Sequence, residues 1–211
     1  MNDHYKFENT PLPYPYDALE PYIDTKTMEL HHDRHLQTYI DNLNAALQDY
    51  PRLQEYSLTE LIHIASRLPA KVGVPIARNA GGVFNHRFYF DEMSPNAESQ
   101  PTGALAGAIA RKFGGVGAFE EKFREAALSV FGSGYAWLVS DRHGNLRIVI
   151  TANQETPLTM DLCPVINIDV WEHAYYLKHY NKRGDYIGDW FHVLDWKKAN
   201  ENYLDCVFCC D

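Results

Sequence analysis

Between Thr25 and Tyr50, apolar and aromatic positions recur three and four residues apart, a spacing that places them on one face of an α-helix. Asp24 or Thr25 is a suitable cap for the first turn, and Pro51 ends the pattern. We therefore predict one long helix in this region. The positions that share its face are Met28, His31, His35, Tyr39, Leu43 and Leu47.

A second helix is predicted after a short polar turn. Ser57 and Glu60 form the pattern of a capping box at the start of SLTELIHIASRL. This helix and the first are expected to form an antiparallel hairpin. Further helical sequence runs from Ala77 to Phe90, after the segment VGVP. The first half of the chain is therefore predicted to be entirely helical.

The segment MSPNAESQPTG is the best candidate for a linker. Beyond it, GALAGAIARKFGG and VGAFEEKFREAALSVFGSG predict two helices. YAWLVSD and LRIVITA flank a turn at residues 142–145, which is typical of a β-hairpin, and PVINIDV is a third β-rich run before a last helical region. We predict an α+β protein, with an N-terminal antiparallel helical hairpin domain at residues 1–94 and a C-terminal α/β domain with a small antiparallel sheet at residues 95–211.

Composition and charge narrow the classes of protein. Hydrophobic residues make up 45% and charged residues 22% of the 211 residues, the usual mixture of a folded globular protein. The net charge of -9 disfavours nucleic acid and anionic membrane surfaces as partners, because both attract positively charged proteins. No secretory signal pattern is present, and no apolar run approaches the ~20 residues of a membrane span. We therefore expect a cytoplasmic protein without a membrane partner.

The four cysteines are unevenly placed along the chain. Cys163 stands alone, while Cys206, Cys209 and Cys210 lie within the last six residues. This distribution predicts no disulfide framework for the body of the fold. Three thiols are too few for a closed tetrahedral zinc site, so a frayed terminus is the expected state of the tail.

Histidines on the first predicted helix are the first candidates for chemistry. His31, His35 and Tyr39 are four residues apart and share one face. Taken alone, a histidine on such a face is more often a satisfied core residue than a ligand. His32 falls outside this face and is expected at the surface or at an interface.

A second cluster lies in IDVWEHAYY, where Asp169, Glu172 and His173 follow a β-rich run. A carboxylate and an imidazole four residues apart can hold one cation, and two acids beside a histidine can act as general acid and base. Asp169 with Glu172 can equally cap a helix. Aromatic residues in the same segment favour a site shielded from water; they are Trp171, Tyr175 and Tyr176.

A third candidate segment is NAGGVFNHRFYF, where Gly81 and Gly82 precede Asn85 and His86. Each glycine costs a helix roughly 1 kcal/mol relative to alanine. Another part of the chain is therefore expected to approach the backbone here, the alternative being a loose helix junction.

Five segments, in this order and at these separations, resemble the signature sequences of iron/manganese superoxide dismutases: TMELHHDRHLQTY, NAGGVFNHRFYF, FGSGYAWLV, TANQETPL and DVWEHAYYLKHYNKRGDYI. The resemblance covers nearly the whole chain. It implies a helical hairpin domain followed by an α/β domain with a three-stranded antiparallel sheet. It also implies one manganese or iron ion per subunit and the disproportionation of superoxide to oxygen and hydrogen peroxide. The ligands that it implies are His31, His86, Asp169 and His173.

The same resemblance implies roles for residues around the ion. Tyr39 and Gln154 form a hydrogen-bonded relay to a solvent ligand, and His35 stands at the entrance. The expected low-dielectric wall consists of Phe84, Tyr135, Trp137 and Trp171. Because superoxide is an anion and the protein is acidic, a local positive rim is expected, with Arg34 and Arg183 as candidates.

The resemblance further implies that two subunits meet near the ion. Glu172 reaches His173 of the partner subunit, and Tyr176 reaches the partner's His35. These contacts require at least two copies, so a homo-oligomer, most simply a homodimer, is expected.

The choice between manganese and iron rests on four positions. Gly82 together with Gln154 resembles the manganese-type arrangement, whereas Val83 and Asn167 depart from it. Manganese is therefore slightly favoured, and use of iron or of both metals stays open. Two other classes of function are a hydrolase with Glu172 as general base beside a metal-bound water, and a metal-storage protein in which Tyr39 and Gln154 have no required role.

Overall fold

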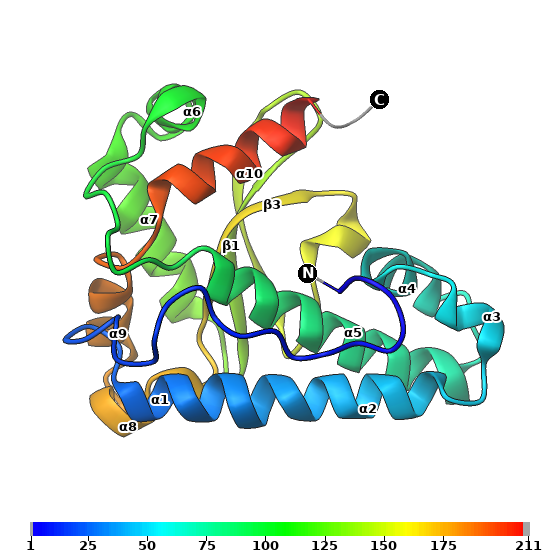
Figure 1. The fold of residues 1–211 in the computed structure, drawn as a ribbon. Helices are drawn as coiled ribbons and strands as arrows, with labels where there is room; N and C mark the ends of the chain where they lie inside the picture. The colour runs from blue at the N-terminus through cyan, green and yellow to red at the C-terminus, as the bar shows by residue number, and fades with distance from the viewer. Residues whose placement is uncertain (1, 209–211) are drawn as a thin grey trace.

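The computed structural model describes residues 2–208, and its N-terminal half is a layer of helices (Figure 1). The first long helix packs against α5, which runs in the opposite direction, and α4 also packs against α5. The predicted helical hairpin domain is confirmed, but the expected pairing of the first helix with the helix that Ser57 opens was wrong, because α5 is the partner of both. The helical segments of this half are α1 (Thr25–Leu30), η1 (His31–Leu36), α2 (Gln37–Leu47), α3 (Pro51–Gln54), α4 (Leu58–Ala65) and α5 (Ala70–Asp91).

The long helix formed by α1, η1 and α2 is continuous but not uniform. Asp24 caps it, because its Oδ2 accepts the backbone N–H of Thr27 at 3.0 Å. The middle section, η1, is π-helical, a widened turn that is frequent at functional sites. This turn carries His31 and His35, so their directions depart from those of a regular α-helix.

Helix α5 begins at Ala70, so the prediction that it starts at Ala77 was wrong. Pro75 lies inside it and cannot donate a hydrogen bond to the carbonyl four residues back. The loss is confined to one bond near the helix start, while packing against α4 continues along the helix. Within residues 2–208, no helix combines the length and apolar character needed to cross a membrane.

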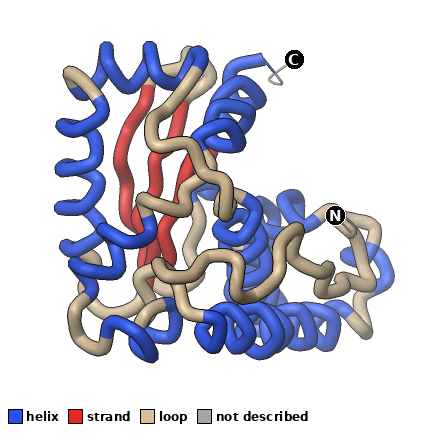
Figure 2. Tube along the Cα trace, turned by 60° about the vertical axis from the view of Figure 1, so that its left-hand side comes forward, coloured by secondary structure: helices blue, strands red, loops and turns tan. Residues whose placement is uncertain are grey.

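The C-terminal half combines a small sheet with covering helices, as Figure 2 shows. The sheet has three antiparallel strands in the order β2-β1-β3, which confirms the prediction. Its elements are α6 (Gly103–Phe113), α7 (Val116–Ser129), β1 (Gly134–Ser140), β2 (Leu146–Ala152), η2 (Pro157–Met160), β3 (Cys163–Asp169), η3 (Glu172–Ala174), α8 (Tyr176–His179), α9 (Arg183–Trp190) and α10 (Trp196–Phe208).

The register of the central strand β1 sets the position of the last residue of β3. Every residue of β1 is buried, and Tyr135 pairs with Asp169 while Trp137 pairs with Asn167. Strand β3 also packs against α5 of the N-terminal layer. The end of β3 is thereby placed against the helix that carries His86.

The expectation that the cysteines form no disulfide in the body of the fold was wrong. Cys163, at the start of β3, is bonded to Cys206 in α10. Helix α10 continues to Phe208 and packs on β3, so Cys206 is buried rather than part of a frayed end. The two residues are 43 positions apart, and only the packing of this helix reveals the pairing. Cys209 and Cys210 lie outside the described residues.

Candidate metal centre

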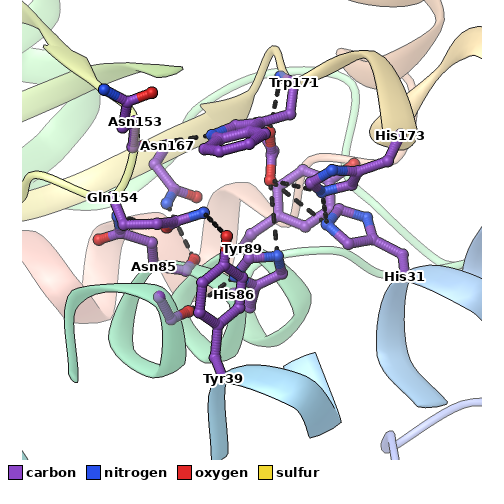
Figure 3. A network of polar contacts seen from close by, with 12 residues as sticks. His31, Tyr39, Asn85, His86, Tyr89, Asn153, Gln154, Asn167, Trp171 and His173 are labelled. Atoms are coloured by element: carbon purple, nitrogen blue, oxygen red, sulfur yellow. Dashed lines mark hydrogen bonds and ion pairs between the residues drawn. The ribbon is translucent and has the colours of Figure 1, made fainter. Parts of the chain in front are cut away.

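Four side chains from four different elements converge between the two layers. His31 comes from η1, His86 from α5, Asp169 from the end of β3 and His173 from η3. One nitrogen or oxygen atom from each lies within 4.8 Å of the others. In Figure 3 the three imidazoles lie around one common centre. The structure thus brings together all four residues that the resemblance implied as ligands.

Distances within this cluster centre on one carboxylate oxygen. Asp169 Oδ2 lies 3.3 Å from Nε2 of His31, 3.6 Å from Nε2 of His173 and 3.9 Å from Nε2 of His86. Asp169 Oδ2 and His86 Nε2 are buried and have no hydrogen-bond partner among the described residues. Buried polar atoms without partners are costly, and a cation between them would satisfy both. Three nitrogens and one oxygen suit a first-row transition ion.

The protonation states of the cluster also fit a cation. Burial lowers the pKa of His31 to about 4, and burial and the nearby His31 lower the pKa of His86 well below 6.5. Burial alone would raise the pKa of Asp169, but the close imidazoles of His173 and His31 hold that pKa below its usual value. At neutral pH His31 and His86 are therefore neutral imidazoles and Asp169 is an ionised carboxylate, the forms that bind metals.

Hydrogen bonds behind the cluster orient the ligand atoms. His86 Nδ1 lies 2.7 Å from the carbonyl oxygen of Gly82, so a proton on Nδ1 leaves Nε2 free for a cation. Asp169 Oδ1 accepts the backbone N–H of Trp171 at 2.8 Å. The N-cap residue of η3 is Trp171 and no side chain caps this helix, so the alternative that Asp169 and Glu172 form a capping pair was wrong, and the other oxygen of Asp169 faces the histidines.

Gln154 and Tyr39 lie beside the cluster and contact one another. Gln154 Nε2 donates to Tyr39 Oη at 3.1 Å, and Gln154 Oε1 accepts from Asn85 Nδ2 at 3.1 Å (Figure 3). Burial raises the pKa of Tyr39, and the charge of Asp169 adds to this, so the phenol stays protonated at neutral pH.

The glycine pair of α5 makes room for these two residues. A Cβ atom at Gly82 would collide with the ring of Tyr39, and one at Gly81 would collide with the carbonyl oxygen of Gln154. The expectation that another part of the chain approaches this backbone is confirmed. Because Gly81 is also within van der Waals reach of Gln154, the helix and the loop after β2 form one packed wall of the site.

Of the remaining predicted site residues, His35 lies beside the ligand cluster, whereas Glu172 and Tyr176 lie at the surface. His35 is half-buried and stacks on His173, with ring centroids 4.1 Å apart. Burial lowers the pKa of His35, and the neighbouring His173 adds to this. Glu172 and Tyr176 are exposed and do not belong to the four-residue cluster of their own chain. An exposed Glu172 outside the cluster also gives the hydrolase alternative no general base at its centre.

His32 is buried, so the expectation that it lies at the surface was wrong. Its Nε2 lies 3.0 Å from the carbonyl oxygen of Thr10, and its Nδ1 lies 3.2 Å from Tyr16 Oη and 2.8 Å from a carboxylate oxygen of Asp33. The N-terminal segment passes over this side of η1 and covers the ring. Helical periodicity cannot reveal such a cover, because it comes from another part of the chain.

Aromatic side chains line the far side of the cluster. Tyr135 and Trp137 are fully buried, and the ring of Trp171 lies 5.5 Å from that of His173. The partly buried Phe84 packs against the same group of rings. Of the expected wall, Tyr135 and Trp171 therefore lie beside the rings of His86 and His173, and Trp137 and Phe84 belong to the same cluster of apolar side chains.

The two arginines expected at a positive rim differ. Arg34 is exposed on η1, beside His35. Arg183 is half-buried, and its guanidinium donates to the carbonyl oxygens of Val130 and Gly132. Arg183 therefore holds the segment before β1 in place. The exposed Arg34 stays the candidate for the positive rim.

Sequence reasoning missed a buried carboxylate that links the two layers. Glu92 follows α5, is fully buried, and accepts the backbone N–H of Asn167 with both oxygens, at 2.9 and 3.0 Å. Asn167 Nδ2 in turn donates to the carbonyl oxygen of Asn85. These bonds fix the strand that ends at Asp169 to the helix that carries His86. No sequence signal reveals them, because a lone glutamate in a polar segment normally indicates a surface position.

Replacing Glu92 with glutamine is expected to change how stability depends on pH. Burial raises the pKa of Glu92 well above 4.5, so the folded protein holds this proton to higher pH than the unfolded chain. The carboxyl of Glu92 stabilises the folded protein fully below pH 4.5. This stabilisation is lost as the pH rises through the raised pKa of the folded state. We expect the free energy of unfolding of Glu92→Gln, relative to wild type, to rise by about 1–3 kcal/mol between pH 4.5 and pH 8.

Urea denaturation at a series of pH values measures this difference. Because both proteins carry the same metal-binding residues, metal binding cancels in the comparison. The exposed Glu98→Gln serves as the control and is expected to show no such trend. If the difference in unfolding free energy between Glu92→Gln and wild type stays constant from pH 4.5 to pH 8, the raised pKa of Glu92 is contradicted.

Comparison with known proteins agrees with this geometry. Residues 6–94 match the family described as iron/manganese superoxide dismutases, alpha-hairpin domain, and residues 101–202 match the C-terminal domain of the same family. A manganese superoxide dismutase of Leptolyngbya boryana is 48% identical over 195 residues, which are 92% of this chain and 79% of that protein.

Two further relatives align over almost their full lengths. The manganese superoxide dismutase of Thermus aquaticus is 45% identical over 199 residues, 94% of this chain and 98% of the relative. That of Pseudomonas aeruginosa is 46% identical over 197 residues, 93% of this chain and 97% of the relative. With both domains matched and the four candidate ligands converging between them, the chain belongs to the iron/manganese superoxide dismutase family.

Proposed function

We propose that this protein is a superoxide dismutase, which converts two superoxide ions and two protons to oxygen and hydrogen peroxide. The observation that carries the proposal is the convergence of three histidines and one aspartate on one point inside a chain of this family. A manganese or iron ion held by these residues supplies the alternating one-electron oxidation and reduction that the reaction needs. The four ligands are His31, His86, Asp169 and His173.

The protein itself has to supply protons and exclude bulk water. The protonated Tyr39 Oη accepts a hydrogen bond from Gln154, so its own proton points away from Gln154 and is available to an oxygen species at the site. Asn85 fixes the orientation of the Gln154 amide by bonding its oxygen. The half-buried His35 is placed to return protons from solvent, because its ring lies at the edge of the cluster.

We propose manganese as the preferred ion. The relatives named above are manganese enzymes. The amide that hydrogen-bonds to Tyr39 belongs to Gln154, and the absence of a side chain at Gly82 leaves the space that the Tyr39 ring occupies. Affinity alone does not decide between the two ions, because the binding order of divalent metals is independent of which one is catalytically competent.

We also propose a cytoplasmic homodimer in which Glu172 contacts His173 of the partner subunit and Tyr176 contacts the partner's His35. Supporting this, both residues are exposed in the single chain, with Tyr176 48% exposed, and both lie within three residues of His173. Such contacts would cover the exposed edge of His173 and hold its ring in place.

One preparation tests the function, the metal and the assembly. The metal-free protein is reconstituted separately with manganese and with iron, and superoxide decay is followed after removal of free metal. We expect the manganese form to be the more active, and light scattering to give about twice the 24.2 kDa of the chain. If neither form removes superoxide faster than free metal, the proposed function fails, and a mass of one chain would overturn the homodimer alone.

A further inference from the structure

A cysteine pair lies far from the metal centre but on a strand that supplies one of its ligands. Cys163 opens β3 and Cys206 lies in α10, with their Cα atoms 5.6 Å apart in the disulfide. Asp169 is at the opposite end of β3, six residues further on, which is roughly 20 Å along a strand. The cysteine pair is therefore spatially separate from the ligand cluster.

Contacts other than the disulfide hold the two cysteines in place. Asn202 of α10 donates from Nδ2 to the carbonyl oxygen of Val165 in β3, and Tyr203 Oη donates to the carbonyl oxygen of Gly144. Tyr203 is itself buried. Helix α10 therefore stays docked on β3 when the disulfide is open, and the two sulfur atoms remain within reach of one another. Such a pair can open and close without refolding.

Exposure gives the two sulfur atoms different roles. Cys206 is 1% exposed, whereas Cys163 is half-buried at the start of its strand. A small oxidant from solvent therefore reaches Cys163 first, and Cys206 is placed to react second. We propose that Cys163 and Cys206 form a reversible dithiol–disulfide couple that hydrogen peroxide closes, the same compound that the proposed dismutase reaction releases.

The closing reaction balances with peroxide as the sole oxidant. The Cys163 thiolate attacks one oxygen of hydrogen peroxide, the O–O bond breaks, and the leaving hydroxide takes a proton to become water. The sulfur of Cys206 then attacks the resulting sulfenic acid; the S–S bond forms, the S–O bond breaks, and a second water leaves with the thiol proton. Two thiols lose two electrons and peroxide gains them. An external thiol reverses the reaction by exchange.

Closing the pair links β3 to α10 and restricts the unfolded chain across a segment of 43 residues. A bond across such a segment is expected to raise the melting temperature of the protein by about 5–12 °C. Activity at 25 °C is expected to change less than twofold, because the pair lies at the far end of β3 from Asp169. Peroxide would thus stabilise the protein without altering its catalytic rate.

The test uses the full-length manganese-loaded protein with Cys209→Ser and Cys210→Ser, which removes the two tail thiols as competing partners. The protein is reduced, freed of reductant, treated with added hydrogen peroxide and quenched with catalase, so that the result does not depend on dismutase activity. Intact mass and peptide mapping follow the cysteines, and the melting temperature is measured before and after. We expect the loss of two hydrogens, one cross-linked peptide containing both cysteines, and reversal by dithiothreitol.

Two results would overturn the couple. One is a Cys163 that goes to sulfinic acid, or stays reduced, with no cross-link to Cys206. The other is a cross-link without a rise in melting temperature. Cys163→Ser, in the same background, is the control and should show no peroxide-dependent rise. Comparing the two redox states of one polypeptide keeps the test valid even if that control folds poorly.

Discussion

Replacing Asp169 with asparagine is expected to remove most of the bound ion and to lower superoxide removal by more than about a hundredfold, since loss of an outer partner of a metal ligand alone costs 10–100-fold. Asparagine has nearly the same shape and can still accept the N–H of Trp171. It lacks the negative charge that faces the three histidines. Elemental analysis of the purified variant measures the metal, and superoxide decay measures the activity.

Asp185→Asn is the matched control for the Asp169 variant. Asp185 is an exposed carboxylate in α9, outside the cluster, so its replacement should leave both metal content and activity unchanged. An Asp169→Asn protein that retains a full complement of metal and near wild-type activity would refute the ligand assignment. Circular dichroism of both variants shows whether the fold is kept.

Gln154→Ala is expected to keep the ion and to lose about a hundredfold in activity, within the range typical of groups that position proton transfer. Gln154 does not belong to the ligand cluster, so metal content should stay at the wild-type level. The variant removes the donor to Tyr39 Oη and leaves Asn85 Nδ2 without its bond to the amide oxygen. The proton-supplying phenol then loses its fixed orientation.

The exposed amide Gln48 supplies the control, and Gln48→Ala should behave as wild type in both measurements. Activity has to be expressed per bound metal ion, so that a defect in chemistry is separated from a defect in loading. A Gln154→Ala protein that loses metal but whose remaining loaded molecules are fully active would contradict the role assigned to this amide.

Most of the secondary structure could be predicted from the sequence, because the signals are local. The capping box at Ser57 and Glu60 is present as expected, and the turn after β1 joins two antiparallel strands. Predictions failed where a contact from elsewhere decided the outcome. The start of α5 was missed because packing against α4 carries the helix through Pro75. His32 was misplaced because the N-terminal segment covers it.

The candidate site was accessible from the sequence only through the resemblance of whole segments. Taken alone, each histidine has a plausible place in an ordinary core, and Asp169 has a plausible place as a cap. His31 and His173 are 142 residues apart, a separation across which no local pattern carries information. The resemblance therefore proposed the ligand set, while the structure shows the geometry and the unpartnered buried atoms that support it.

The sequence by itself determined the order of elements, their amphipathic faces and the residues able to bind a metal, because helix periodicity, capping and strand alternation depend on near neighbours. Only the tertiary structure decided which atoms meet. The burial that lowers the pKa of His31 arises where η1 packs against α5, and the link between Glu92 and Asn167 and the Cys163–Cys206 bond arise where β3 packs against other elements. Burial and proximity are properties of the packed chain, so they appear only when distant segments come into contact.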